Sequence, residues 1–270
     1  MINKELIRQK FASSVNTYEE ESVAQQHIAQ KMAQLLAQHL PASCFKQIVE
    51  LGCGTGYYSR LLIRRYGEDS LILNDLCPEM LDYCHRQVSE KVRLLPGDAE
   101  SVQLPRHTSL LTSCSAFQWF EHPGDFFRHS QSALSRGGYL AFSTFGPDNA
   151  KEVRELSGKG LHYLGLEEWK RLIEPYFDLC YAEEERLNYR FSSPLEVLRH
   201  LKKTGVTGLG DQPMSCRELH RFLAEYNHRF GVGQEVTLTY HPVYLIARKK
   251  EQRAYVSASP YLHGRLKSPM

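Results

Sequence analysis

One short stretch of this chain combines glycines and a carboxylate at a spacing that could bind a small molecule. The stretch ELGCGTG (residues 50–56) follows the mainly apolar run 47–49 and precedes a helix-like segment over 57–66. Alternate glycines in a tight turn leave backbone N–H groups uncovered and let a ligand approach the main chain closely. The motif predicts a cofactor-binding turn, although a glycine turn that only joins a strand to a helix would have the same pattern.

The spacing of the glycines and the acid before them favour one cofactor over another. One residue separates Gly54 from Gly56, whereas two residues separate the last two glycines of the dinucleotide fingerprint. The Glu50 carboxylate would repel a pyrophosphate, but it would attract a cationic amino group. The turn, with Gly52 as its first glycine, therefore suits S-adenosylmethionine better than NAD.

Two further acids follow predicted strands. The run 71–75 ends in Asp75, roughly 20 residues after the glycines, where a carboxylate can accept hydrogen bonds from ribose hydroxyls. The run 92–99 contains Asp98, which could bond the exocyclic amine of adenine. Either acid alone is more typical of a turn or a helix cap. Together with Glu50 and the glycines, they predict a complete donor site.

The elements around these motifs should position aromatic side chains over the same site. A strand over 109–116 leads into FQWFEHP (117–123), and strand ends at the carboxyl edge of a parallel sheet face the ligand crevice. Gln118 and Trp119 are therefore predicted to lie below the methyl group. Simple packing of Trp119 between a helix and the sheet is the alternative.

The segment before the glycine turn is predicted to be helical over 3–40, since apolar residues recur at helical spacing until Pro41. Phe11, Tyr18 and Gln25 are seven residues apart and could share one face toward the donor. The alternative places Phe11 in the core and the other two at the surface.

After the acids, the sequence predicts a helix over 124–136 that ends at Gly137-Gly138, and then a strand over 139–145. The insertion of roughly 45 residues before the last strand is too long for a plain connection and predicts a helical lid. The predicted organisation is a single domain over 1–250, with N-terminal helices at 1–40, a donor-binding core at 45–146, lid segments at 147–175 and 190–235, last strands at 177–189 and 236–248, and a mobile tail at 251–270.

Composition excludes several other classes of protein. The 270 residues carry 33 Lys and Arg against 31 Asp and Glu, a net charge of +2 that argues against a general nucleic-acid binder. No apolar window approaches the length of a membrane span, and the N-terminus does not read as a secretory signal. The 7 cysteines are scattered without a C-x-x-C pair, which predicts reduced thiols in a cytoplasmic protein and no metal site.

The motifs ELGCGTG, LNDLCPEML and GDAESVQLP resemble the first three motifs of the class I S-adenosylmethionine-dependent methyltransferases, over roughly 45–150. That resemblance implies an α/β, Rossmann-like fold. Its sheet would have seven strands, mostly parallel, with helices on both faces, an N-terminal helical segment and a helical lid insertion. The predicted donor-binding residues are Tyr18, Gln25, Glu50, Gly52, Gly54, Gly56, Asp75, Leu76, Asp98, Ala99, Ser115 and Gln118.

Four other segments carry a sharper resemblance. FASSVNTYEEESVAQQ (11–26), FSTFGPDN (142–149), SGKGLHY (157–163) and SPLEVLRHLKKTGVTG (193–208) are similar to the malonyl-acyl-carrier-protein O-methyltransferases of biotin synthesis. The likeness spans 8 to about 210. Cys77 departs from it, because many relatives have serine there, and the last twenty or so residues match nothing.

This resemblance implies methyl transfer to the free carboxylate of malonyl-acyl carrier protein, giving the ester that primes pimeloyl synthesis. It also implies a cytoplasmic monomer whose partner is the carrier protein, with no nucleic acid and no membrane. An ionised carboxylate needs no general base, so residues that orient it should suffice. The candidates are Arg199, which could bind it bidentately, and Lys202, His162 and Tyr163.

Those four residues have plainer interpretations, since Arg199 and Lys202 could form a solvated helix face and the other two a packed loop. Two alternative functions also remain. One is O-methylation of a free small carboxylic acid such as aconitate. The other is a protein that binds S-adenosylmethionine without catalysing transfer.

Overall fold

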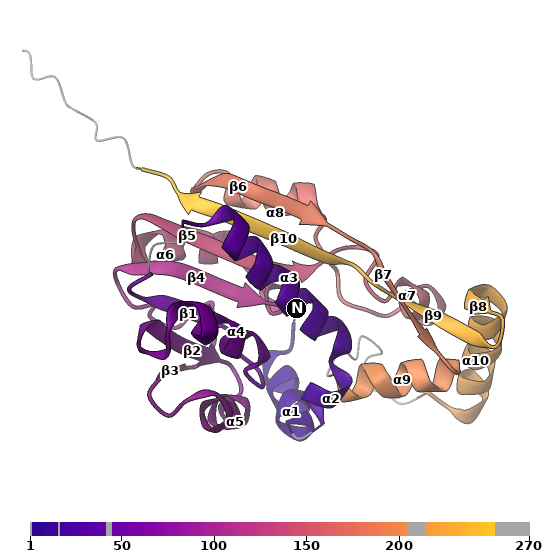
Figure 1. The fold of residues 1–270 in the computed structure, drawn as a ribbon. Coiled ribbons are helices and arrows are strands. Elements are labelled where there is room, and N and C mark those ends of the chain that lie inside the picture. The colour runs from indigo at the N-terminus through magenta and orange to yellow at the C-terminus, as the bar shows by residue number, and fades with distance from the viewer. Residues whose placement is uncertain (1, 16, 42–44, 205–213, 252–270) are drawn as a thin grey trace, which may run out of the picture.

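The computed structural model describes residues 2–15, 17–41, 45–204 and 214–251. Its main element is a seven-stranded sheet in which five parallel strands are followed by an antiparallel pair (Figure 1). The predicted class I sheet is confirmed. In order across the sheet, the strands are β3 (Arg93–Pro96), β2 (Leu71–Asp75), β1 (Ile48–Leu51), β4 (Thr108–Cys114), β5 (Leu134–Phe145), β10 (Pro242–Lys249) and β6 (Phe177–Glu184).

Both faces of the sheet are covered by helices, as a parallel sheet requires. In the interior strand β1, Ile48 packs into one core while Val49 and Leu51 pack into the other. The first core lies under α3 (Val23–His39), α4 (Tyr57–Tyr66) and α5 (Pro78–Val88). The second core lies under α6 (Pro123–Ala133) and α8 (Leu166–Ile173), where Trp169 is buried.

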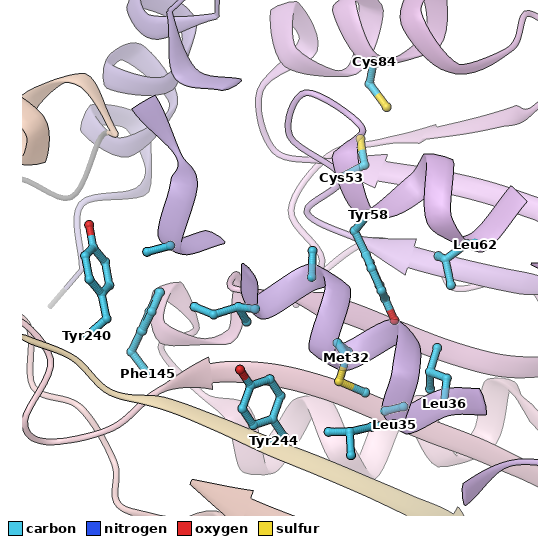
Figure 2. Packing of buried hydrophobic residues seen from close by; sticks show 14 of the residues in the cluster. Met32, Leu35, Leu36, Cys53, Tyr58, Leu62, Cys84, Phe145, Tyr240 and Tyr244 are labelled. Carbon is cyan, nitrogen blue, oxygen red and sulfur yellow. The ribbon is translucent and has the colours of Figure 1, made fainter. Parts of the chain in front are cut away.

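The N-terminal segment forms three helices rather than one long run. Only α3 packs lengthwise on the sheet, with Met32 and Leu36 fully buried near Tyr58 of α4 (Figure 2). The preceding helices α1 (Lys4–Ser14) and α2 (Tyr18–Glu21) extend beyond the carboxyl ends of the parallel strands (Figure 1). Because the helical segment is divided into three helices, α1 and α2 can lie over the carboxyl ends of the strands.

The helix predicted over 124–136 is three residues too long. α6 ends at Ala133, because Leu134 has extended backbone angles and already begins β5. Gly137, with φ +69°, lies within the irregular start of that strand, where the pairing register between β4 and β5 shifts. The glycine pair therefore shapes a strand instead of ending a helix.

The last strands are each divided between two sheets. The predicted strand 177–189 forms β6 and then β7 (Leu187–Phe191), and 236–248 forms β9 (Glu235–Tyr240) and β10, with His241 between them. β7, β9 and β8 (Gly231–Val232) make a separate three-stranded sheet, which we call the small sheet (Figure 1).

The helices of the predicted lid divide in the same way. α7 (Lys151–Ser157), α9 (Pro194–Lys203) and α10 (Cys216–Phe230) pack around the small sheet. By contrast, α8 packs against β6 and α6 on the main sheet, although it falls in the range predicted as lid. The part of the lid over 205–213 and the tail from 252 lie outside the described residues.

Candidate functional site

A cavity lies at the carboxyl edge of the parallel strands, bounded on its open side by α1 and α2. Its walls come from the ends of β1, β2 and β4, from the loops that follow these strands and β3, and from the first turns of α3. All of the predicted donor-binding residues line it except Gly56 and Gln118. Those that do are Tyr18, Gln25, Glu50, Gly52, Gly54, Asp75, Leu76, Asp98, Ala99 and Ser115.

The glycine turn provides both close packing and open space. Gly52, Gly54 and Gly56 all have positive φ, at +69°, +54° and +88°, which L-residues rarely adopt. A Cβ at Gly52 would lie 2.6 Å from the Cβ of Ala116, so the turn packs tightly against the end of β4. A Cβ at Gly54 would meet nothing within 4 Å, because that position faces the cavity.

Gly56 has a packing role in the structure. A Cβ there would lie 2.5 Å from Val88 and 2.7 Å from the Sγ of Cys84, both on α5. Figure 2 shows Cys84 and Cys53 directed toward one another beside this turn. Gly56 therefore lets the turn lie close to α5, and its predicted contact with the donor stays a prediction.

Three buried acceptor atoms on residues that line the cavity lack hydrogen-bond partners among the described residues; one is the Oδ1 of Asn74, and the other two belong to Glu50 and Gln25. Glu50 is 1% exposed, and its Oε2 is unpaired. Burial is the main cause that raises the pKa of Glu50 well above its ordinary value. The Oε1 of Gln25 is also buried and unpaired. A cationic ligand donating N–H groups would satisfy the unpaired oxygens of Glu50 and Gln25, and the amino group of S-adenosylmethionine has that chemistry.

Asp75 connects the glycine turn to the end of β2. Its two carboxylate oxygens accept hydrogen bonds from the backbone N–H of Gly54, at 2.9 Å, and of Cys77, at 2.8 Å. Burial raises the pKa of Asp75, and these backbone hydrogen bonds oppose the rise. The acid is therefore held rigidly beside the turn, with lone pairs left for ribose hydroxyls.

Asp98 is held by contacts with its own loop and with α1. Its Oδ1 accepts the backbone N–H of Glu100 at 3.0 Å, and its Oδ2 lies 2.6 Å from the Nζ of Lys4. Lys4 also forms an ion pair with Glu100. Sequence reasoning did not select Lys4, although Lys4, Ile7, Arg8 and Phe11 recur at helical spacing and all line the cavity.

Aromatic side chains close the cavity near the end of β4. Phe11 makes edge-to-face contacts with Tyr18 and Trp119, at centroid distances of 5.9 and 6.0 Å. Trp119 lines the cavity, whereas its neighbour Gln118 does not. The Gln118 amide donates to the carbonyl of Ser115 at 2.6 Å and shapes the loop. Its predicted donor contact stays a prediction.

The four predicted acceptor residues do not line this cavity. Arg199 and Lys202 are exposed on α9, where Arg199 forms an ion pair with Glu196 one turn away. His162 is exposed in the segment between α7 and α8. Tyr163 is buried, and its hydroxyl accepts a hydrogen bond from Asn149 at 3.1 Å. Packing accounts for the position of Tyr163, and the catalytic roles of all four stay predictions.

Two classes of site are not found in the described part of the chain. No group of three or more His, Cys, Asp and Glu side chains there could hold a metal ion. Nor does any helix in those residues have the length and apolar character needed to cross a membrane.

The sheet order, the glycine turn and the acids at successive strand ends define a class I S-adenosylmethionine-dependent methyltransferase. A family model described as a methyltransferase domain matches residues 48–138. A putative methyltransferase from Bacillus halodurans C-125 has the same fold, with a TM-score of 0.60, 15% identity and coverage of 81% of this chain and 98% of that one. A Haemonchus contortus phosphoethanolamine N-methyltransferase 2, solved with S-adenosyl-L-methionine, has a TM-score of 0.52 at 16% identity over 82% of this chain and 53% of its own.

Sequence comparison identifies the family within this class. A malonyl-[acyl-carrier protein] O-methyltransferase from Bacteroides thetaiotaomicron is 45% identical, and the alignment covers 93% of this chain and all of the relative. The relative of the same name from Haemophilus influenzae is 35% identical over 92% of this chain and 95% of its own. The chain belongs to this family.

A longer relative of the same name, from Bacteroides fragilis, is 49% identical over 92% of this chain. The present chain spans about half the length of that relative, 51%.

Proposed function

We propose that this methyltransferase transfers the methyl group of S-adenosylmethionine to the free carboxylate of malonyl-acyl carrier protein. The observation that carries the proposal is the identity of 45% with a relative of that name over that relative's whole length. The ester product would prime pimeloyl synthesis for biotin, as the resemblance implies. We further propose a cytoplasmic monomer. The described cysteines are all free thiols, which suits a reducing compartment.

Different residues of the cavity suit different parts of the donor. Glu50 and Gln25 offer unpaired acceptors for the amino group, Asp75 offers acceptors for the ribose, and Asp98 lies where an adenine amine could donate to it. Gly54 leaves room beside the main chain. When bound, S-adenosylmethionine supplies an electrophilic methyl group carried on a sulfonium.

The protein has little proton chemistry to perform in this reaction. A malonyl carboxylate is ionised at neutral pH, so its oxygen can attack the methyl group without a general base. Catalysis then depends on alignment and on the removal of water from the charged oxygen. The aromatic group formed by Phe11, Tyr18 and Trp119 covers this part of the cavity and can exclude water.

We place the acceptor between the cavity and α9. α2 begins with Tyr18, which lines the cavity, and it packs against α9. Lys203 of α9 pairs with Glu21 of α2 at 2.6 Å, so the two helices are tied together. Lys202 is exposed, and no acidic partner for it occurs in the described residues, whereas Arg199 is engaged by Glu196. This contrast favours Lys202 over Arg199 as the cation that attracts the acceptor.

The direct test is transfer of labelled methyl from S-adenosylmethionine to three acceptors: malonyl-acyl carrier protein, malonyl-coenzyme A and aconitate. We expect the highest kcat/KM with the carrier-protein thioester. A higher value with aconitate would assign the protein to free-acid methylation. Donor binding without transfer to any of the three would identify a donor-binding protein and overturn the proposal.

A further inference from the structure

Helix α1 presents one face to the donor cavity but is weakly buried. Its cavity-lining residues Lys4, Ile7, Arg8 and Phe11 recur at intervals of three and four, so they share that face. Of the eleven residues of α1, only Ser14 is buried. Burial of apolar side chains therefore contributes little to holding this helix, and its position depends more on individual contacts, which include an ion pair of Arg8 with Glu79 of α5 at 3.7 Å.

The strongest polar contact is an ion pair at the N-terminal end of α1. The Nζ of Lys4 lies 2.6 Å from Asp98 and also pairs with Glu100, and all three side chains are at most 28% exposed. The hydrogen bonds and charges of these two acids raise the pKa of Lys4 against the opposing effect of desolvation. We call this group of three residues the Lys4 clasp.

Glu100 anchors the clasp to the body of the protein. Its carboxylate also accepts the backbone N–H groups of Glu121, at 2.9 Å, and His122, at 2.7 Å. The Ile2 backbone donates to the Glu121 side chain at 3.0 Å, which adds a second tie at the same end of α1. The opposite, C-terminal half of the helix makes the aromatic contacts of Phe11.

We propose that Lys4 is a positioning residue for the methyl donor, and that the Lys4 clasp holds α1 closed over the bound donor. Lys4 fixes the carboxylate of Asp98, whose oxygens each have a second lone pair available to an adenine amine. α1 then covers the donor through Ile7, Arg8 and Phe11. Exchange of product for fresh donor requires the clasp to open, so Lys4 sets the rate of product release.

This inference rests on the donor site and not on the identity of the acceptor. Failure of the acceptor assignment therefore leaves it intact. The measured quantity is the dissociation rate of S-adenosylhomocysteine, followed by the fluorescence of Trp119, which lines the cavity. We expect Lys4→Met to raise that rate about 5-fold, a factor at the upper end of what one exposed ion pair contributes, because Lys4 makes two.

Salt dependence separates the clasp from a general loss of structure. In the wild-type protein, NaCl should accelerate dissociation by screening the ion pair, while in Lys4→Met the rate should not respond. The matched control is Lys91→Met, which removes an exposed ion pair with Glu68, at 2.8 Å, and belongs to neither α1 nor the cavity. It should behave as wild type. Lys4→Arg, which keeps the charge, should restore slow dissociation in part.

A second readout needs no ligand. Hydrogen exchange of the α1 amides should be faster in Lys4→Met than in the wild type, with the rest of the sheet unchanged. Should Lys4→Met fold poorly, Glu100→Gln weakens the clasp from the other side and should give the same pattern. A wild-type dissociation rate and salt response in a folded Lys4→Met protein would overturn the proposal. Tighter donor binding would overturn it as well, because Lys4 would then be a competitor of adenine.

Discussion

Two buried glutamates show how the donor cavity differs from the region around the small sheet. Glu50 and Glu152 are 1% and 2% exposed, respectively. Glu152 of α7 accepts hydrogen bonds from the backbone N–H and the hydroxyl of Thr239 in β9, so both of its carboxyl oxygens have partners within the fold. Glu50 has an oxygen with no partner in the described residues. Burial alone therefore does not distinguish the two glutamates, whereas the unpaired acceptor on a cavity-lining side chain does.

Other buried polar side chains around the small sheet also have hydrogen-bond partners within the fold. Around the small sheet, the Tyr226 hydroxyl donates to the carbonyl of Thr237 at 2.8 Å, and His200 Nε2 lies 2.7 Å from the Tyr240 hydroxyl. The polar groups of these two pairs satisfy one another. We infer that the region around the small sheet contributes to function through the exposed charged side chains of α9. The donor cavity contributes through buried acceptors with which a ligand can pair.

The largest expected effect is at Gly54, where the side chain of Gly54→Val would enter the cavity in a backbone conformation with φ +54°. Donor affinity measured by calorimetry should fall by more than about 100-fold, since bulk displaces the ligand and the turn is strained. Gly233 is the matched control, because it has φ +66° and equally open space, but lies outside the cavity. Gly233→Val should keep the wild-type affinity, and equal losses in both variants would show that strain alone is responsible.

The paired substitutions Glu50→Gln and Glu152→Gln test the comparison directly. Glu50→Gln should weaken donor binding by about 10-fold or more, because a charge-assisted hydrogen bond is lost, and should not lower thermal stability. Glu152→Gln should destabilise the fold by about 1–3 kcal/mol and leave donor affinity unchanged. Calorimetry and thermal unfolding measure both quantities, and the reverse pattern would contradict the assignment of Glu50.

At the surface of α9, Lys202→Ala should raise the apparent KM for malonyl-acyl carrier protein several-fold without changing donor affinity. Arg199→Ala should have a smaller effect, because Glu196 already neutralises Arg199. Steady-state kinetics with varied acceptor distinguishes the two. Unchanged acceptor kinetics in both variants would remove α9 from the acceptor path.

The last prediction concerns the pH dependence of donor affinity in the unmodified protein. Burial raises the pKa of Glu50 in the free protein, and the donor's ammonium favours the ionised form. Donor binding should therefore release a proton, and affinity should rise with pH until the raised pKa is passed, by no more than about tenfold per pH unit. Asp75 has a raised pKa of its own, so Glu50→Gln should flatten most of the trend and leave the rest. Titration calorimetry in two buffers of different ionisation enthalpy measures the proton release.

The sequence by itself determined the central part of this protein. The glycine turn, the acids at the ends of β1 and β2 and the acid just after β3 could be read directly, because each lies at or just after the end of a contiguous strand with its own residue pattern. The parallel order of the sheet brings these strand ends together, so Glu50, Asp75 and Asp98 meet in one cavity. The local residue pattern and the parallel topology of the sheet were sufficient to predict that these three acids lie together.

Only the tertiary structure decided the parts that depend on distant contacts. Lys4 and Asp98 are 94 positions apart, and no local pattern links them. The sequence also could not predict that the last strand is divided at His241. Both β9 and β10 have strand-forming sequences, and these sequences do not show which sheet each strand joins. Helical spacing likewise predicted the N-terminal helices, but it could not show that α1 lies across the open side of the cavity while most of α3 packs along the sheet. Which surface a helix covers is set by the path of the whole chain.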